Sequence, residues 1–320
     1  MTKTNKISES NKNWYILIAG FPRPTKPLTL TPGITLVPIK SPITVFDLAS
    51  AGAVGFHGWS VLEPIAPALT VEIESAKDSD ILPGYDTLNC AWLASTLLVL
   101  KGYTRHICVA CSSYTWNYIA GHQPKSAESF RKQIKAEGVE SAVFRPKKDL
   151  PSFEGNLLDF HLEILTHSNA KVGMPSEEDI SWIRKYYNTF NRLASESESF
   201  RFALEAATDW RFAKDARSAV SRLWSGIEAI FGITSELIYR ISLISACLLS
   251  PRGPLRREKF DEIKNLYSLR SKVVHGEKLS EENISKALSK SFVLLSDLLI
   301  YTITKGHVLN KNDFDEAIFH

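Results

Sequence analysis

The sequence predicts an α+β protein, with a mixed N-terminal α/β domain over residues 1–172 and an all-helical bundle over residues 173–320. The first third of the chain contains short runs of β-branched residues between prolines and glycines, which is typical of strands. From about residue 175 the apolar residues instead recur every three or four positions, as they do in amphipathic helices. These patterns do not determine the order of the strands in the sheet.

The elements of the N-terminal domain follow from local composition. Strand character is found in four early runs: residues 14–21, 34–39, 43–48 and 67–76. A buried helix is expected over 88–100, with Asp86 as its N-cap and Gly102 just past its end. Further along the chain, the pattern predicts strands at 105–116 and 140–146, with a polar helix at 125–137 between them.

The helices of the C-terminal domain are more regular. Ser176 and three acidic residues begin the first of them, because a hydroxyl cap and negative charge both favour a helix N-terminus. Apolar periodicity predicts further helices over residues 209–232, 235–250, 256–275 and 281–304. The connections between them are short, which is typical of antiparallel neighbours in a bundle.

Composition excludes several classes of protein. With 44% hydrophobic and 23% charged residues, the chain is neither disordered nor fibrous. Its net charge of +3 is too small for a protein that binds nucleic acid over its whole surface. The four cysteines form no framework, and Arg240 and Asp297 interrupt the most apolar segments, so we expect a cytoplasmic protein without a membrane span.

One helix end has an unusual composition. In "NLYSLRSKVVHGEKLS", residues 265–280, an amphipathic helix ends with Arg270 and His275, and Gly276 follows at once. A histidine transfers protons near neutral pH, and an arginine neutralises a phosphate that gains charge in a transition state. The two residues lie five positions apart and therefore splay by about 140° on one helix. Two such helices packed across a two-fold axis would bring two arginines and two histidines into one cleft.

Residues 209–279 resemble the Apea-like branch of the HEPN superfamily. The resemblance rests on "DARSAVSRLWSGIEAIFG", a largely apolar helix, and "FDEIKNLYSLRSKVVHG", in which Arg270 and His275 match the Arg-x(4–6)-His motif of that superfamily. Ser271 departs from the Asn, Asp or His that often follows the arginine. Residues 1–172 carry no comparable resemblance.

The resemblance implies a dimeric, metal-independent endoribonuclease without a cofactor, in which the ribose 2′-hydroxyl is the nucleophile. It implies catalytic roles for Arg270 and His275. Beside them, Ser271 and Tyr267 are expected to shape the cleft, and the basic residues Lys272, Arg256 and Arg257 are expected to hold the RNA backbone. Such enzymes act in prokaryotic defence, abortive infection or toxin systems. The substrate would be RNA, whether tRNA, mRNA or rRNA, and the N-terminal domain would sense a phage-derived trigger or select the target.

Charge supports an RNA surface near the motif. Residues 252–272 contain seven basic and three acidic side chains, a net charge of 7 − 3 = +4. A local excess of positive charge attracts a phosphate backbone. The same residues also suit an ordinary solvated helix.

Three alternatives stay open at this point. Arg270 and His275 can be cations that stabilise a helix C-terminus, where positive charge is favoured by about 0.3–1 kcal/mol. The helical domain can be a non-catalytic module that dimerises or binds RNA or protein. Cys108 and Cys111, with His106 before them and His122 after them, can be imagined as zinc ligands, although a structural zinc site normally needs two ligand pairs.

Overall fold

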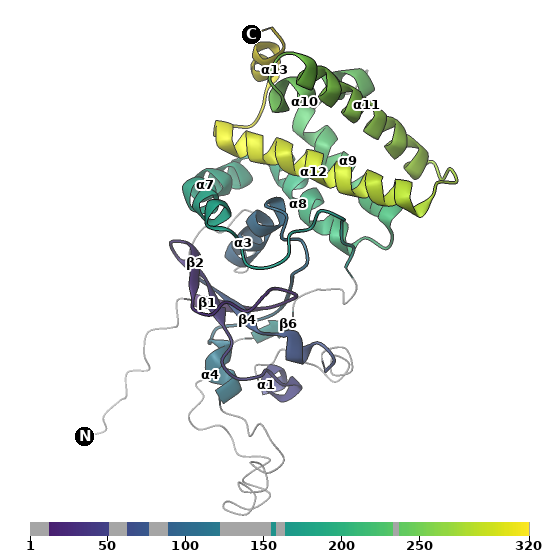
Figure 1. Ribbon diagram of the computed structural model, residues 1–320. Helices are drawn as coiled ribbons and strands as arrows, with labels where there is room; N and C mark the ends of the chain where they lie inside the picture. The colour runs from purple at the N-terminus through teal and green to yellow at the C-terminus, as the bar shows by residue number, and fades with distance from the viewer. Residues whose placement is uncertain are drawn as a thin grey trace, which may run out of the picture. The chain divides into compact units, whose positions relative to one another are not determined.

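The computed structural model describes residues 13–50, 63–76, 89–121, 155–157, 164–232 and 237–319 (Figure 1). The chain forms two compact units, one built on an antiparallel sheet and the other on helices, so the predicted α+β class is confirmed. The helical unit includes residues 93–105 as well as residues 161–320. The boundary at residue 172 stays a prediction.

The first unit contains a six-stranded sheet with the order β2-β3-β4-β1-β5-β6. Its strands are β1 (Asn13–Ala19), β2 (Leu28–Thr31), β3 (Ile34–Pro38), β4 (Val71–Ala76), β5 (Ile107–Ser112) and β6 (Gly155–Leu157). Neighbouring strands pair antiparallel throughout. The central strand β1 is buried on both faces, which explains its continuous apolar run rather than an alternating one.

The predicted strand at residues 43–48 is wrong. The chain forms helix α1 (Val45–Ser50) there. The Thr44 N–H donates to Asp47 Oδ2 at 2.8 Å, and the Asp47 N–H donates back to Thr44 Oγ1 at 3.3 Å. This reciprocal cap favours a helix start over the β propensity of the local residues. The predicted elements at 125–137 and 140–146 lie outside the described residues.

A buried carboxyl group connects the sheet to helix α4 (Trp116–Gly121). Glu72 of β4 accepts hydrogen bonds from the Trp116 N–H at 2.7 Å, from the Thr115 hydroxyl, and from Asn117 Nδ2 at 3.2 Å. Burial raises the pKa of Glu72 to about 7, although these hydrogen bonds act to lower it.

The second unit is a bundle of helices. Its elements are α3 (Asn89–Leu100), α7 (Glu177–Glu196), α8 (Glu198–Asp209), the short η3 (Trp210–Phe212), α9 (Ala216–Phe231), α10 (Leu237–Leu249), α11 (Pro254–Val274), α12 (Glu281–Lys305) and α13 (Lys311–Phe319). Of α3, the part from Leu93 onward groups with this unit. The predicted helices at 235–250, 256–275 and 281–304 are confirmed within two residues at each end.

The single helix predicted over residues 209–232 is wrong, because the chain breaks there. A 3-10 turn ends at Phe212, and α9 begins only after Asp215, whose side chain accepts from the Ser218 N–H at 2.8 Å. Trp210 and Ala213 therefore do not share a face of α9, although their spacing from Val220 is helical.

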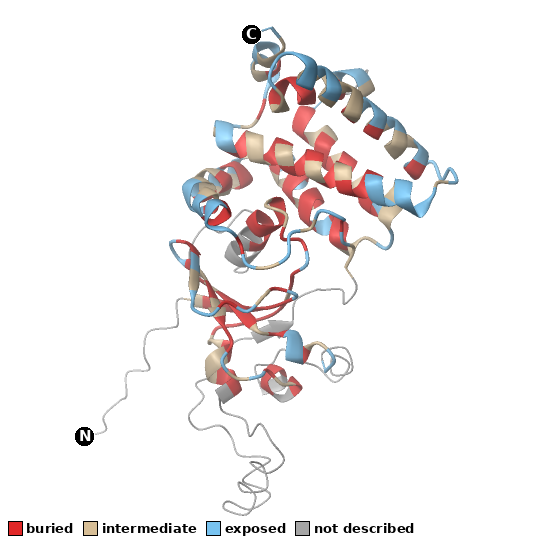
Figure 2. Cartoon of the chain, viewed as in Figure 1, coloured by how far each residue is buried: buried red, intermediate tan, exposed pale blue. Residues whose placement is uncertain are grey.

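Helices α8, α9 and α12 pack closely at Gly226. A Cβ atom at this position would lie 2.7 Å from Ala206 Cβ and 3.0 Å from Leu295 Cδ2, which is too near for any other residue without a shift of the helices. Figure 2 shows that the middle of α12 and the adjoining helices is mostly buried. The large aromatic side chains Trp210, Trp224 and Phe292 are fully enclosed in this core.

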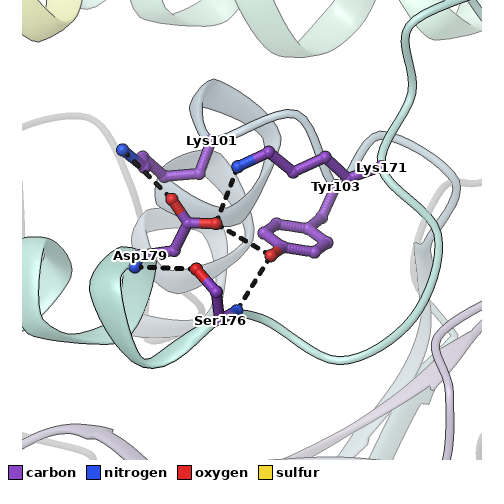
Figure 3. Close-up of polar contacts among 5 residues, drawn as sticks. All are labelled: Lys101, Tyr103, Lys171, Ser176 and Asp179. Carbon is purple, nitrogen blue, oxygen red and sulfur yellow. Dashed lines mark hydrogen bonds and ion pairs between the residues drawn. The ribbon is translucent and has the colours of Figure 1, made fainter.

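Asp179, in the first turn of α7, connects that helix to the end of α3 (Figure 3). Its carboxylate accepts from Lys171 Nζ at 2.7 Å and Tyr103 Oη at 2.8 Å, and it pairs with Lys101 Nζ at 3.2 Å. Burial acts to raise the pKa of Asp179, but these donors outweigh it and lower the pKa to about 2.

One described helix, Glu281–Lys305, is long and apolar enough to cross a membrane by length and composition. In the most apolar part of this helix, 67% is buried inside the protein, as expected for the core helix of a bundle. Length and apolarity alone therefore give only weak evidence for a membrane span.

Candidate functional site

Helix α11 carries most of the predicted site residues. Gly253, at φ 119°, and Pro254 begin it, since proline is favoured in the first turn, where its missing N–H is not needed. Its buried stripe consists of Ile263, Leu266 and Val273, which face the bundle. The rest of the helix is largely exposed or half-buried, as Figure 2 shows.

Arg270 lies at the edge of this buried stripe. Its side chain is 20% exposed, and Nη2 lies 3.4 Å from Glu228 Oε1 of α9. The guanidinium also stands over the ring of Tyr267 at 5.5 Å. Its buried Nε has no hydrogen-bond partner among the described residues. The arginine is thus held in place by a long ion pair and an aromatic face, and it retains unused donor capacity.

Tyr267 is itself fixed by the core. Its ring packs edge to face with Trp224 at 5.1 Å, and Trp224 Nε1 donates to Ser291 Oγ at 2.9 Å. Aromatic contacts of this type limit the orientations that a ring can adopt. The ring thus gives Arg270 a fixed surface to lie on, and the supporting role of Tyr267 stays a prediction.

His275 forms the C-cap of α11 and is exposed. Its N–H donates to the Ser271 carbonyl at 2.9 Å, and Gly276 follows with φ 77°. The Glu277 N–H donates to the Lys272 carbonyl at 3.0 Å, which completes a Schellman motif. This motif needs a positive φ at Gly276, which glycine adopts without strain. Within one chain, the described contacts include no bond between the Arg270 and His275 side chains.

Arg217, which no sequence pattern predicted as part of the site, caps this helix end. Arg217 of α9 donates from Nη1 to the Val273 carbonyl at 2.7 Å and from Nη2 to the Glu277 carbonyl at 3.0 Å. The guanidinium therefore already supplies positive charge at the C-terminus of α11, where the helix dipole favours it. His275 is not required for this purpose, which weakens the interpretation that it serves as a stabilising cation. Arg217 and Val273 are separated by 56 positions, and no local sequence pattern predicts a contact over that separation.

The predicted RNA contacts lie at different ends of α11. Lys272, beside the motif, is exposed. Arg256 lies fourteen positions before Arg270, about 21 Å along the helix axis. It donates to the Ser250 carbonyl at 3.1 Å and the Ala317 carbonyl at 3.3 Å, so it already holds backbone groups. Arg257 is 76% exposed and pairs with Asp261 at 2.8 Å. Ser271 is half-buried, and its carbonyl binds the His275 N–H.

A groove of about 800 Å³ runs along the other side of α11, next to α12. Its lining includes Leu266, Leu269 and a chain of ion pairs in which Glu262 meets Lys290 at 2.6 Å and Lys259 at 3.4 Å. Neither Arg270 nor His275 contributes to its lining. The groove is therefore not part of the predicted site.

The two cysteines of the zinc alternative lie on one strand of the sheet unit. Cys111 is buried in β5 and Cys108 is half-buried in the same strand. In the part of the chain that the structure describes, no three His, Cys, Asp or Glu side chains are grouped as metal ligands would be. His122 lies outside that part.

The chain matches no known family model, no curated protein and no solved structure. The resemblance to the Apea-like HEPN branch therefore depends on the residues quoted for it. It remains a hypothesis about this chain.

Proposed function

We propose that the protein is a metal-independent endoribonuclease of HEPN type, with His275 as general acid and base and Arg270 as the stabiliser of the phosphate. The observation that carries this proposal is Arg270 itself. It is an arginine with an unpartnered buried Nε among the described residues, at the edge of a buried stripe and five positions before an exposed histidine.

The reaction needs only these two types of group. The ribose 2′-hydroxyl attacks the adjacent phosphorus and gives up its proton to a histidine acting as base. The bond from phosphorus to the 5′-oxygen breaks, and that oxygen takes a proton from a histidine acting as acid. The products are a 2′,3′-cyclic phosphate and a 5′-hydroxyl. An arginine opposite the pentavalent phosphorus stabilises the negative charge that develops there.

The long contact between Arg270 and Glu228 leaves the guanidinium available. At 3.4 Å the pair is at the outer limit of a hydrogen bond, and both side chains are partly exposed, 20% and 29%. An RNA phosphate offers a shorter, bidentate arrangement and can replace it. Glu228 would then hold Arg270 in position until the substrate arrives.

The proposed site uses two copies of the chain. Arg270 and His275 diverge on one α11, because five positions correspond to about 140° of helical rotation. A homodimer through the helical unit would place the two motifs in one cleft, so that residues from both copies act on one phosphate.

The proposal extends to the biological setting only by resemblance. A protein of this type would be cytoplasmic and would act in antiviral defence or as a toxin, with the N-terminal unit responding to a trigger. Expression of the active enzyme would harm the cell, and substitution of His275 would remove that harm.

The Arg270–Glu228 pair also favours a second function. An arginine that serves only to pair with Glu228 and to cover Tyr267 fits a non-catalytic module that binds RNA or a second chain. In that case substitution of His275 would leave both the RNA affinity and the cellular phenotype unchanged.

The experiment that separates the two functions is an RNA-cleavage assay in EDTA on total cellular RNA. We expect the wild-type protein to produce discrete fragments with cyclic phosphate ends, and Arg270→Ala and His275→Asn to produce none. Circular dichroism and sedimentation must first show that each variant keeps the wild-type fold and oligomeric state.

Lys278→Ala provides the matched control. Lys278 is an exposed cation three residues after His275, outside the proposed chemistry, so its loss leaves cleavage unchanged. RNA from phage-infected cells is tested in parallel, since a resting enzyme needs its trigger. Intact RNA under both conditions would contradict the nuclease and favour the binding module.

A further inference from the structure

Beyond the proposed active site, the exposed start of α11 carries an aromatic and basic patch. It consists of Tyr239 of α10 and of Arg257, Phe260 and Lys264 of α11, and we call it the Tyr239 patch. Tyr239 is 54% exposed, so its ring is accessible at the surface of the helical unit. Its ring meets that of Phe260 at a centroid distance of 5.7 Å, nearly perpendicular to it.

Two cations border these rings. The Arg257 guanidinium lies 5.7 Å and Lys264 Nζ lies 6.0 Å from the centre of the Phe260 ring. Positions 257, 260 and 264 are three and four residues apart, so all three side chains emerge on one face of the helix. On that face Arg257 and Lys264 are exposed and Phe260 is half-buried, and the face turns away from the buried stripe of Ile263 and Leu266.

Most cations of this segment already pair with an oxygen atom of the protein. Among the seven basic residues of 252–272, five have oxygen partners: Arg252 with Ile318, Arg256 with Ser250 and Ala317, Arg257 with Asp261, Lys259 with Glu262, and Arg270 with Glu228. Within the described part of the chain, Lys264 and Lys272 have no such partner. Lys264 lies in the patch and Lys272 lies beside His275.

We infer that the Tyr239 patch binds single-stranded RNA, with bases stacked on the Tyr239 and Phe260 rings and phosphates bound by Lys264 and by Arg257, whose exposed ion pair with Asp261 a phosphate can replace. Exposed rings accept any base by stacking, and cations beside them neutralise the backbone, which is how proteins bind single strands without reading sequence. A base paired in a duplex does not offer its face to such a ring. The patch therefore selects unpaired RNA.

The position of the patch relates it to the proposed reaction. Lys264 lies six positions before Arg270, which is about 9 Å along α11. Lys272 follows Arg270 by two positions. A strand held at the patch would be directed along one helix toward Arg270 and His275. This inference rests on the proposed function for its role, but RNA binding by the patch can be measured without cleavage.

The test uses the full chain carrying His275→Ala, which cannot cleave, and a fluorescein-labelled oligouridylate of roughly 12 nucleotides, within the span of a single-strand site. Fluorescence anisotropy gives Kd over a series of salt concentrations. We expect Tyr239→Leu and Phe260→Leu each to raise Kd about fivefold or more, since stacking contributes that much per base. We expect Lys264→Gln to reduce the slope of log K against log salt by about 0.7.

Helix α7 offers a matched control. There Lys185 Nζ lies 5.0 Å from the ring centre of Tyr186, the same kind of pair at another place on the bundle. Lys185→Gln and Tyr186→Leu should leave Kd unchanged. If Phe260→Leu fails to fold, Tyr239→Leu alone decides, because its exposed ring supports no core.

Several results would overturn the inference. One is an unchanged Kd in the patch variants, and another is an equal loss in the α7 controls. Equal affinity for duplex RNA would mean that phosphate charge, not stacking, drives binding. A patch variant that alters sedimentation but not Kd would show that the patch is a contact between copies of the chain. Binding at the patch without any cleavage by the wild type would leave this inference intact and contradict only the nuclease.

Discussion

Arg217 donates a hydrogen bond of 2.7 Å to the carbonyl of Val273, and so joins the start of α9 to the turn that presents His275. A second bond from the same guanidinium reaches Glu277 on the far side of that histidine. The His275 turn is thus held from both sides by one side chain. Its geometry depends on tertiary structure as well as on the glycine that ends the helix.

Arg217→Gln should loosen this turn and leave the bundle folded. A hydrogen bond to a charged group contributes about 1.5–3 kcal/mol to the free energy of unfolding. Because the Arg217 contacts are partly exposed, we expect a loss near the lower end of this range. Amide hydrogen exchange at His275, Gly276 and Glu277 should accelerate, and RNA cleavage should fall with it. Arg192, which donates to the Gly306 carbonyl at the end of α12, is the matched control. Equal exchange changes at the His275 turn in Arg192→Gln would contradict the assignment.

Because of His167, we expect the folded protein to lose stability in mild acid. It is buried against Trp210 and Phe292, with centroid distances of 6.0 and 4.6 Å, and neither ring nitrogen has a partner among the described protein groups. Burial, followed by the charge of Arg105, lowers the pKa of His167 to about 4. Because the unfolded chain takes up this proton near its ordinary pKa of 6.5, stability falls as the pH drops from about 6.5 to 4.

His167→Phe should remove that slope. Each pKa unit corresponds to about 1.4 kcal/mol, so the loss between pH 7 and 4 should shrink by about 3 kcal/mol. Denaturant unfolding at a series of pH values measures it. At pH 7 the variant should be at least as stable as the wild type, because a buried unpartnered nitrogen is removed. A marked loss at pH 7 would instead mean that the ring nitrogens have a stabilising partner.

Much of the bundle could be predicted from sequence, because helix signals are local. The apolar spacing of α11 and the glycine at 276 determine where that helix lies and ends. The break at Asp215 was missed, since the 3-10 turn at Trp210 imitates helical spacing. The strand prediction at 43–48 failed because Thr44 and Asp47 form a cap, which β propensity does not take into account. Arg217 could not be found, since its contacts join segments distant in sequence.

Asp179 should make the helical unit sensitive to stronger acid. Its folded pKa of about 2 lies below the ordinary value of 3.8, so its contribution is complete above about pH 4 and is lost as the pH falls toward 2. Asp179→Asn should cost about 2 kcal/mol at pH 7 and should flatten stability between pH 4 and 2. Hydrogen exchange of α7 amides, measured at a series of pH values between 4 and 2, gives the local free energy of unfolding and tests this. Asp313→Asn, which removes a carboxylate at the start of α13, should leave exchange in α7 unchanged.

Glu72 gives the sheet unit the opposite dependence on pH. Its pKa is raised from 4.5 to about 7, chiefly by burial, so the folded state binds the proton more tightly and stability falls as the pH rises from 4.5 to 7. Glu72→Gln should remove this decline, making the variant more stable relative to the wild type at pH 8 than at pH 4. Hydrogen exchange of β1 and β4 peptides reports it. A variant that shows the wild-type decline would contradict this origin.

Both ends of α11 are fastened to other parts of the bundle by arginines. Arg256, near its first turn, holds the Ser250 and Ala317 carbonyls, and Arg217 holds its last turn. A helix fixed in this way cannot slide or tilt without breaking several charged hydrogen bonds at once. Control of the proposed activity would therefore have to act on access to α11, by uncovering it or by bringing a second copy to it. A trigger would then control whether RNA or a second copy of the chain reaches α11. The helix itself would already have its final conformation before the trigger acts.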